Sequence, residues 1–60
     1  MITKFTDSDN NICYMEYFEW DGKSPDHFRV WSEEFPKVIH IFDCEEVESL
    51  LDRGIWRRLS

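Results

Sequence analysis

The first half of the chain contains two stretches with the pattern of β-strands, joined by turn residues. Ile2–Thr6 predicts a short strand, and residues 7–11 are consecutive turn formers, so we expect a hairpin that leads into a second strand over residues 12–20. One face of that second strand holds Cys13, Met15, Tyr17 and Glu19, and the other holds Ile12, Tyr14, Glu16, Phe18 and Trp20. Because both faces carry large apolar groups, the strand is either covered on two sides or leaves its second face for a partner.

Two further strands are expected in the middle of the chain. Residues 21–26 form a loop with glycine and proline, and His27–Ser32 then alternates as a half-buried strand, with Phe28 and Val30 on one face and Arg29 and Trp31 on the other. Pro36 ends this region, since proline cannot donate to a β-ladder. Residues 37–42 predict a fourth strand that is apolar enough for the centre of the sheet, with Val38, His40 and Phe42 opposite Ile39 and Ile41.

A helix is expected over residues 44–53. Asp43 is a good N-cap residue, and Glu46 lies three positions later, as in a capping box. At 100° per residue one side of the helix carries an apolar stripe that consists of Val47, Leu50 and Leu51. We expect this stripe to pack on the sheet, with Leu50 and Leu51 buried.

The helix is expected to end at Gly54 in the left-handed conformation, because continuing it would place Arg58 in the apolar stripe. Residues 55–59 then form an extended tail. Its alternation places Ile55, Arg57 and Leu59 on one side and Trp56 and Arg58 on the other.

Composition supports a small α+β fold. The 60 residues are 42% apolar and 17% aromatic, which is too hydrophobic for a disordered chain. Alanine and glutamine are absent, while aromatic and β-branched residues are plentiful, which favours a sheet over a helical bundle. We therefore expect one domain over residues 1–60, with an antiparallel sheet of three to five strands and one C-terminal helix packed on one face.

Charge narrows the classes of partner. Residues 1–52 hold all 13 acids and four of the seven bases, a sum of −9, and the last eight residues add +3, giving −6. A chain of this sign lacks the clustered bases that bind nucleic acid or an anionic membrane, so a basic protein surface is the expected partner. No secretory leader or membrane span is found, and Cys13 and Cys44 show no paired spacing, so we expect free thiols and a cytoplasmic protein.

Catalytic and metal-binding patterns are weak. His40, Asp43 and Cys44 are close in sequence, and a cysteine in the first turn of a helix is a candidate nucleophile. A chain of this length has little room for a substrate cleft, so we do not expect an enzyme or a cofactor. His27 and His40 could join the two cysteines around zinc, but none of the four has the short paired spacing of zinc sites, and no metal site is expected.

A row of acids on the predicted helix is the first candidate binding surface. Glu45, Glu48 and Asp52 fall within about 60° of one another, opposite the apolar stripe, with axial rises of roughly 4.5 and 6 Å. Such a row can stand in for nucleic-acid phosphates, and Glu33, Glu34 and Asp43 could extend it, depending on how the loop folds. The alternative is that these acids simply keep the helix surface solvated.

Surplus aromatic residues are the second candidate surface. One helix covers only one face of a sheet, so the other face could bind a partner or a second copy of the chain; the residues concerned are Tyr14, Phe18, Trp20, Trp31 and Trp56. The alternative is that these side chains fill a core that lacks smaller aliphatic residues.

Together these features predict a non-enzymatic binding module, namely an inhibitor that docks on a basic, nucleic-acid-binding protein and so acts as a nucleic-acid mimic. In size and charge the chain resembles phage and mobile-element counter-defence proteins, including anti-CRISPR and anti-restriction inhibitors. The alternative function is an antitoxin-like or adaptor protein that forms a homodimer through its aromatic sheet face.

Overall fold

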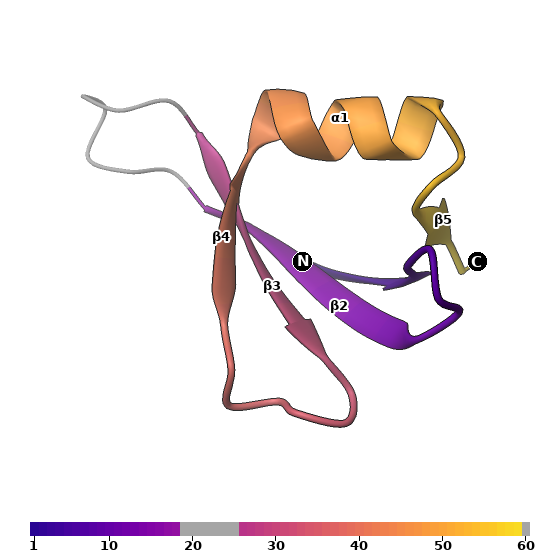
Figure 1. The fold of residues 1–60 in the computed structure, drawn as a ribbon. Helices are drawn as coiled ribbons and strands as arrows, with labels where there is room; N and C mark the ends of the chain where they lie inside the picture. Colours follow the sequence, from indigo (N-terminus) through magenta and orange to yellow (C-terminus); the bar gives the residue numbers. More distant parts are fainter. Residues whose placement is uncertain (19–25, 60) are drawn as a thin grey trace.

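The computed structural model describes residues 1–18 and 26–59, which form one antiparallel sheet and one helix (Figure 1). The elements are β1 (Ile2–Thr6), β2 (Ile12–Phe18), β3 (His27–Ser32), β4 (His40–Asp43), α1 (Cys44–Asp52) and β5 (Arg57–Arg58). The strand order is β4-β3-β2-β1-β5, with every pairing antiparallel. The α+β architecture expected from the sequence is confirmed, with five strands and one helix near the C-terminus that packs against the sheet.

The first hairpin forms because Asp7 organises the turn after β1. Its carboxylate accepts hydrogen bonds from the backbone N–H groups of Asp9 and Asn11, both at 2.9 Å, and Asn10 takes a positive φ of 63°. Burial acts to raise the pKa of Asp7, but the bonds from Asn11 and Asp9 outweigh it, and the net pKa is lowered. The register that follows places Phe5 opposite Cys13 and Thr3 opposite Met15.

The core lies between α1 and the sheet face that it covers. Phe5, Met15 and Val47 are at most 1% exposed, and Cys13, Val30 and Trp56 complete the buried set. Leu50 and Leu51 pack against this core but are half-buried rather than buried. The predicted apolar stripe of the helix is therefore correct, with Val47 at its most buried position.

Trp56 was expected on the outer side of the tail, and this expectation is wrong. Its indole is 8% exposed, with its ring centroid 4.5 Å from that of Phe5 and 5.1 Å from that of Phe42. The cause lies in the helix end: Gly54 has φ +73°, and the N–H groups of Ile55 and Trp56 both return to the carbonyl of Leu50. This left-handed stop turns the chain so that Trp56 enters the core before β5 pairs with β1.

The fourth strand also differs from its prediction. Residues 37–42 were expected at the centre of the sheet, whereas β4 begins at His40 and, among the described residues, is an edge strand paired with β3 alone. A turn at residues 36–37, in which Val38 donates to the carbonyl of Phe35, delays the pairing. Apolar character did not distinguish a central from an edge position.

The capping box is the third difference. Asp43 is the N-cap residue, as expected, but its side chain makes no capping hydrogen bond. Its carboxylate instead lies 3.1 Å from Nε2 of His27, its register partner on β3. The Asp43 carboxylate therefore contacts the neighbouring strand instead of capping the helix as the local sequence predicts.

Replacing Trp56 tests this core. Trp56→Ala should cost about 3 to 5 kcal/mol, which is comparable to the roughly 3 to 5 kcal/mol that a single small core supplies. The variant should therefore be largely unfolded in a circular-dichroism melt. Trp31→Ala, a half-buried tryptophan on the opposite sheet face, is the matched control and should remain folded. Equal melts for Trp56→Ala and the wild type would contradict the assigned core.

Candidate functional site: an acidic helix and an aromatic sheet face

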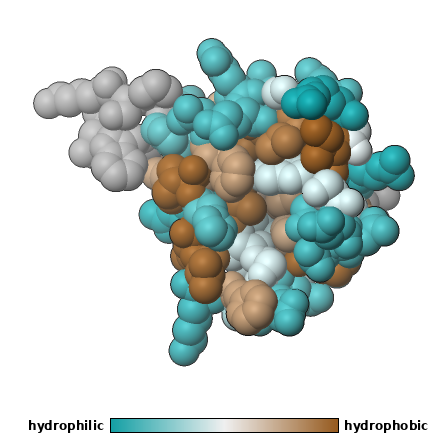
Figure 2. All heavy atoms as spheres, viewed as in Figure 1, coloured by the Kyte–Doolittle hydropathy of each residue, from teal (hydrophilic) through white to brown (hydrophobic). Residues whose placement is uncertain are grey.

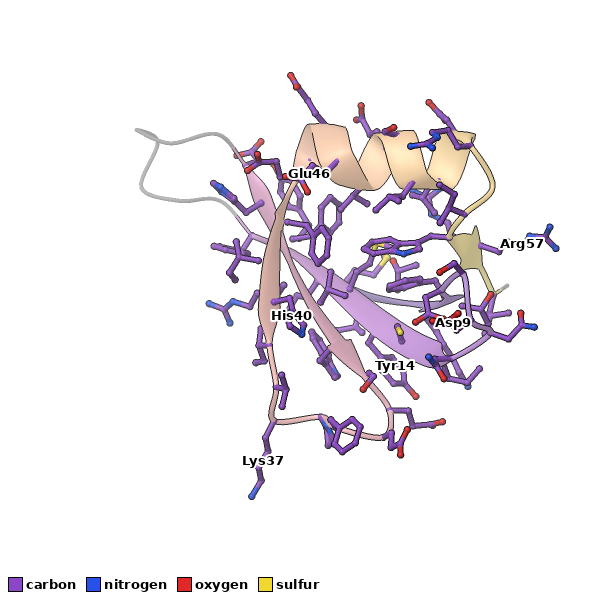
Figure 3. All side chains as sticks on the ribbon, in the orientation of Figure 1. Asp9, Tyr14, Lys37, His40, Glu46 and Arg57 are labelled. Carbon is purple, nitrogen blue, oxygen red and sulfur yellow. The ribbon has the colours of Figure 1, made fainter. Side chains whose placement is uncertain are left out.

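The acids of α1 form an exposed, negatively charged surface. Glu45, Glu48 and Asp52 are all exposed, as is Glu46, and the last turn of the helix carries no base. Within residues 1–18 and 26–59 no ion pair involves any of these four carboxylates. Figure 3 shows Glu46 on the side of the molecule that α1 forms, far from the labelled Lys37 and Arg57. The helix therefore presents carboxylates to solvent that form no ion pair within the described residues, and the exposed Arg53 follows it as the C-cap residue.

The expected extension of this row through Glu33 and Glu34 is wrong. Glu33 and Glu34 lie in the connection between β3 and β4, which runs at the end of the sheet away from α1 (Figure 1). Glu33 is fixed there, because its backbone N–H donates to the carbonyl of Ile12 at 2.9 Å and its carboxylate accepts the hydroxyl of Tyr14 at 3.1 Å. The acidic row therefore does not continue through Glu33 and Glu34, whereas the exposed Asp43 lies next to Glu45 at the start of the helix.

The sheet face opposite α1, here called the outer face, carries three of the five aromatic side chains predicted to bind a partner. Tyr14 and Trp31 are register partners on β2 and β3, and their rings stack with centroids 6.0 Å apart. Phe18 stacks on His27, also at 6.0 Å, and the guanidinium of Arg29 lies 4.8 Å from the centre of the Phe18 ring. No helix or strand of the described residues lies over this face.

The structure thus brings together three of the five predicted aromatic residues. Tyr14, Phe18 and Trp31 share the outer face and are half-buried by one another and by their neighbours. Trp56 belongs to the core on the other side of the sheet, and Trp20 lies outside the described residues. The hydrogen bond to Glu33 raises the pKa of Tyr14, with smaller contributions from burial and from the negative charge of Glu33.

The candidate nucleophile lacks its base. His40 and Asp43 are three positions apart on β4, so their side chains lie on opposite sheet faces, and Asp43 pairs with His27 instead. Burial raises the pKa of the Cys44 thiol, and the negative charges of Asp26, Glu48 and Asp43 raise it further. The raised pKa runs opposite to the lowering that a helix N-terminus would give a reactive cysteine.

A hollow on the helix side of the sheet was not foreseen from the sequence. It has a volume of about 340 Å³ and opens between the first hairpin and the connection from β3 to β4, with Phe5, Cys13 and Trp56 in its walls and His40 and Ser32 among its polar groups. Burial raises the pKa of Cys13, and the charge and hydrogen bond of Asp7 act in the same direction. No local motif signals this hollow, because segments far apart in the chain form it.

Neither a metal-ion cluster nor a membrane-spanning helix is present among the described residues. In the described part of the chain, no group of three or more histidine, cysteine, aspartate or glutamate side chains is arranged to hold a metal ion. Across residues 1–18 and 26–59, no helix combines the length and the apolar character that crossing a membrane requires.

Comparisons of the chain with protein-family models, with curated proteins and with solved structures found no match.

Thiol reactivity tests the state of Cys44. Because the thiolate is the reactive form, Cys44 in a Cys13→Ser background should react with iodoacetamide more slowly than a cysteine in an unstructured peptide at the same neutral pH. Asp26→Asn should accelerate the reaction, since removing this negative charge lowers the thiol pKa. Asp9→Asn makes the same charge change in the turn between β1 and β2, and it should leave the alkylation rate of Cys44 unchanged. Faster alkylation of Cys44 than of the peptide would contradict the assignment.

Proposed function

We propose that this protein is a non-enzymatic binding module whose acidic helix docks on a basic surface of another protein. The observation that carries the proposal is the exposed negative charge of α1: Glu45, Glu48 and Asp52 form no ion pair within the described residues, and the last turn of the helix holds no base. Acids in the early turns stabilise the helix, but Asp52 at the C-terminal end opposes the helix dipole. Helix stability therefore does not explain the whole row, whereas recognition of a basic partner does.

The proposed partner is a nucleic-acid-binding protein, because such proteins display clustered lysines and arginines that an acidic row complements. Occupying that surface would exclude the nucleic acid, which makes the module an inhibitor. Counter-defence proteins of the anti-CRISPR or anti-restriction type act on partners of this kind, and the likeness in size and charge extends the proposal to that class. Because Glu33 and Glu34 do not extend the row, the proposed mimicry is limited to a short run of phosphates.

A second candidate function is supported by the outer face. Tyr14 and Trp31 stack on a face over which no described element lies, and tyrosine and tryptophan are common anchors of protein interfaces. An adaptor or antitoxin-like protein would bind its partner through this face, with the helix acids serving solubility. Binding through the outer face would depend on apolar burial and would survive high salt, whereas binding through the helix would not.

Neutralising the helix acids distinguishes the two functions. The variant Glu45→Gln, Glu48→Gln, Asp52→Asn should stay folded, since exposed substitutions usually change stability by about 0.5 kcal/mol or less each. Partners are first captured from a bacterial lysate with the wild type and identified, and binding is then measured with the purified partner. The triple variant should bind at least about tenfold more weakly, equivalent to about 1.4 kcal/mol. Binding by the wild type should weaken with salt and compete with DNA or RNA.

The matched control is Asp9→Asn, Glu33→Gln, Glu34→Gln. It removes the same number of negative charges from exposed positions away from α1, and it should bind as the wild type does. Equal losses in both triple variants would indicate a non-specific charge effect and contradict docking by the helix. Loss of binding in Trp31→Ala, with full binding by the helix variant, would establish the outer face instead.

A further inference from the structure

The two edges of the sheet differ in their chemistry. One edge is β5, which consists of Arg57 and Arg58, both exposed; short, charged strands of this kind discourage pairing with another chain. The other edge is β4 together with the residues that precede it, and there Val38, Ile39 and Ile41 are 53%, 52% and 54% exposed. In Figure 2 hydrophobic side chains gather along this edge of the described molecule. An apolar edge strand is a template for adding another strand.

The backbone of this edge has a defined orientation. Cys44 donates to the carbonyl of Asp26 across the β3–β4 pair, so, by the alternation of an antiparallel ladder, Phe42 and His40 also direct their N–H and C=O groups toward β3. The backbone groups of Ile39 and Ile41 consequently point away from the sheet. Val38 already donates to Phe35 and needs no partner.

The sequence at this edge is complementary to itself. It reads Lys-Val-Ile-His-Ile-Phe-Asp over residues 37–43. When two copies are placed antiparallel about a two-fold axis at His40, each Lys37 lies opposite Asp43 of the second copy, each Val38 opposite Phe42, and each Ile39 opposite Ile41. The hydrogen-bonded positions are then Ile39 and Ile41, whose backbone groups point outward. Moving the axis to Ile41 would place Ile39 opposite Asp43, and moving it to Ile39 would place Lys37 opposite Ile41.

We propose that the edge formed by residues 37–43 is a self-association surface on which a second copy of this chain adds antiparallel, with His40 at the two-fold axis. The charge pair is available, because the Asp43 side chain is 56% exposed although it also contacts His27. Residues 37–39, which have the strand pattern but no strand partner among the described residues, extend β4 in the dimer. The outer faces of both copies lie on the same side of the joined sheet. This assembly is independent of docking by the acidic helix.

Sedimentation of the full chain under reducing conditions, from micromolar to millimolar concentration, is the first test. The wild type should pass from monomer to dimer. Ile39→Pro should weaken the dimer at least about tenfold, since proline removes an N–H that has no acceptor among the described residues and that the second copy would use, while the β3–β4 ladder and the melt stay intact. Ile39→Ala keeps that N–H and should weaken the dimer less than Ile39→Pro does.

Charge provides a second pair of variants. Lys37→Glu places two carboxylates opposite each other at each end of the interface and should weaken the dimer about fivefold, because like charges directly opposite are destabilising. Lys4→Glu, which changes an exposed base on β1, alters the net charge equally, from −6 to −8, and should leave the dimer unchanged.

Cross-linking tests the register. Opposed residues in a non-hydrogen-bonded antiparallel pair have Cα atoms about 4.5 Å apart, within the roughly 4.4 to 6.8 Å that a disulfide spans. His40→Cys should therefore form a disulfide-linked dimer on mild oxidation. Val38→Cys is the matched control, because its counterpart would lie four residues along the strand, about 13 Å away. The proposal is overturned if the wild type stays monomeric at millimolar concentration, if Ile39→Pro dimerises as well as the wild type, or if Val38→Cys cross-links as readily as His40→Cys.

Discussion

The contact of Trp56 with Phe5 and Phe42 is the interaction on which the rest of the structure depends. These rings come from the tail after the helix, the first strand and the edge strand, so one cluster joins the two ends of the chain to the strand that precedes the helix. A chain of 60 residues buries a smaller fraction of its surface on folding than a larger domain does, and large aromatic side chains provide much apolar contact per residue. Without Trp56 the short β5 would have just two register pairs to hold it on β1.

Placing the core on one side of the sheet determines where the remaining groups go. The one described helix covers the face that holds Phe5, Met15 and Val30, so the side chains of alternate residues are left on the outer face. There Tyr14 and Trp31 cover each other, and Arg29 covers Phe18. The outer face is therefore a surface of mutually packed rings, and the acids lie on the far side of the molecule along α1. Two surfaces of different chemistry follow from one asymmetric core.

Local sequence patterns predicted the bounds of the strands and the helix better than they predicted which of these elements and side chains lie next to each other in the fold. Alternation gave the bounds of β1 and β3, and Gly54 marked the end of the helix, because strand faces and helix stops are decided within a few residues. The side of the tail on which Trp56 lies, the edge position of β4 and the partner of Asp43 depend on residues far along the chain. The same division holds for the candidate site: helical spacing identified the exposed acids of α1, whereas the positions of Glu33 and Glu34 required the path of a loop.

The exposed edge at β4 also follows from the small number of helices and strands that the described residues form. In a larger domain a second helix or a further strand would cover β4, but this chain uses its C-terminal residues to bring Trp56 into the core and to form β5 at the opposite edge. Arginines protect that edge, whereas isoleucines and a valine occupy the other. Leaving apolar side chains and outward backbone groups in water at one edge is unfavourable for an isolated copy. Pairing with a second copy removes both costs with residues already present, and it leaves α1 and the outer face free for other partners.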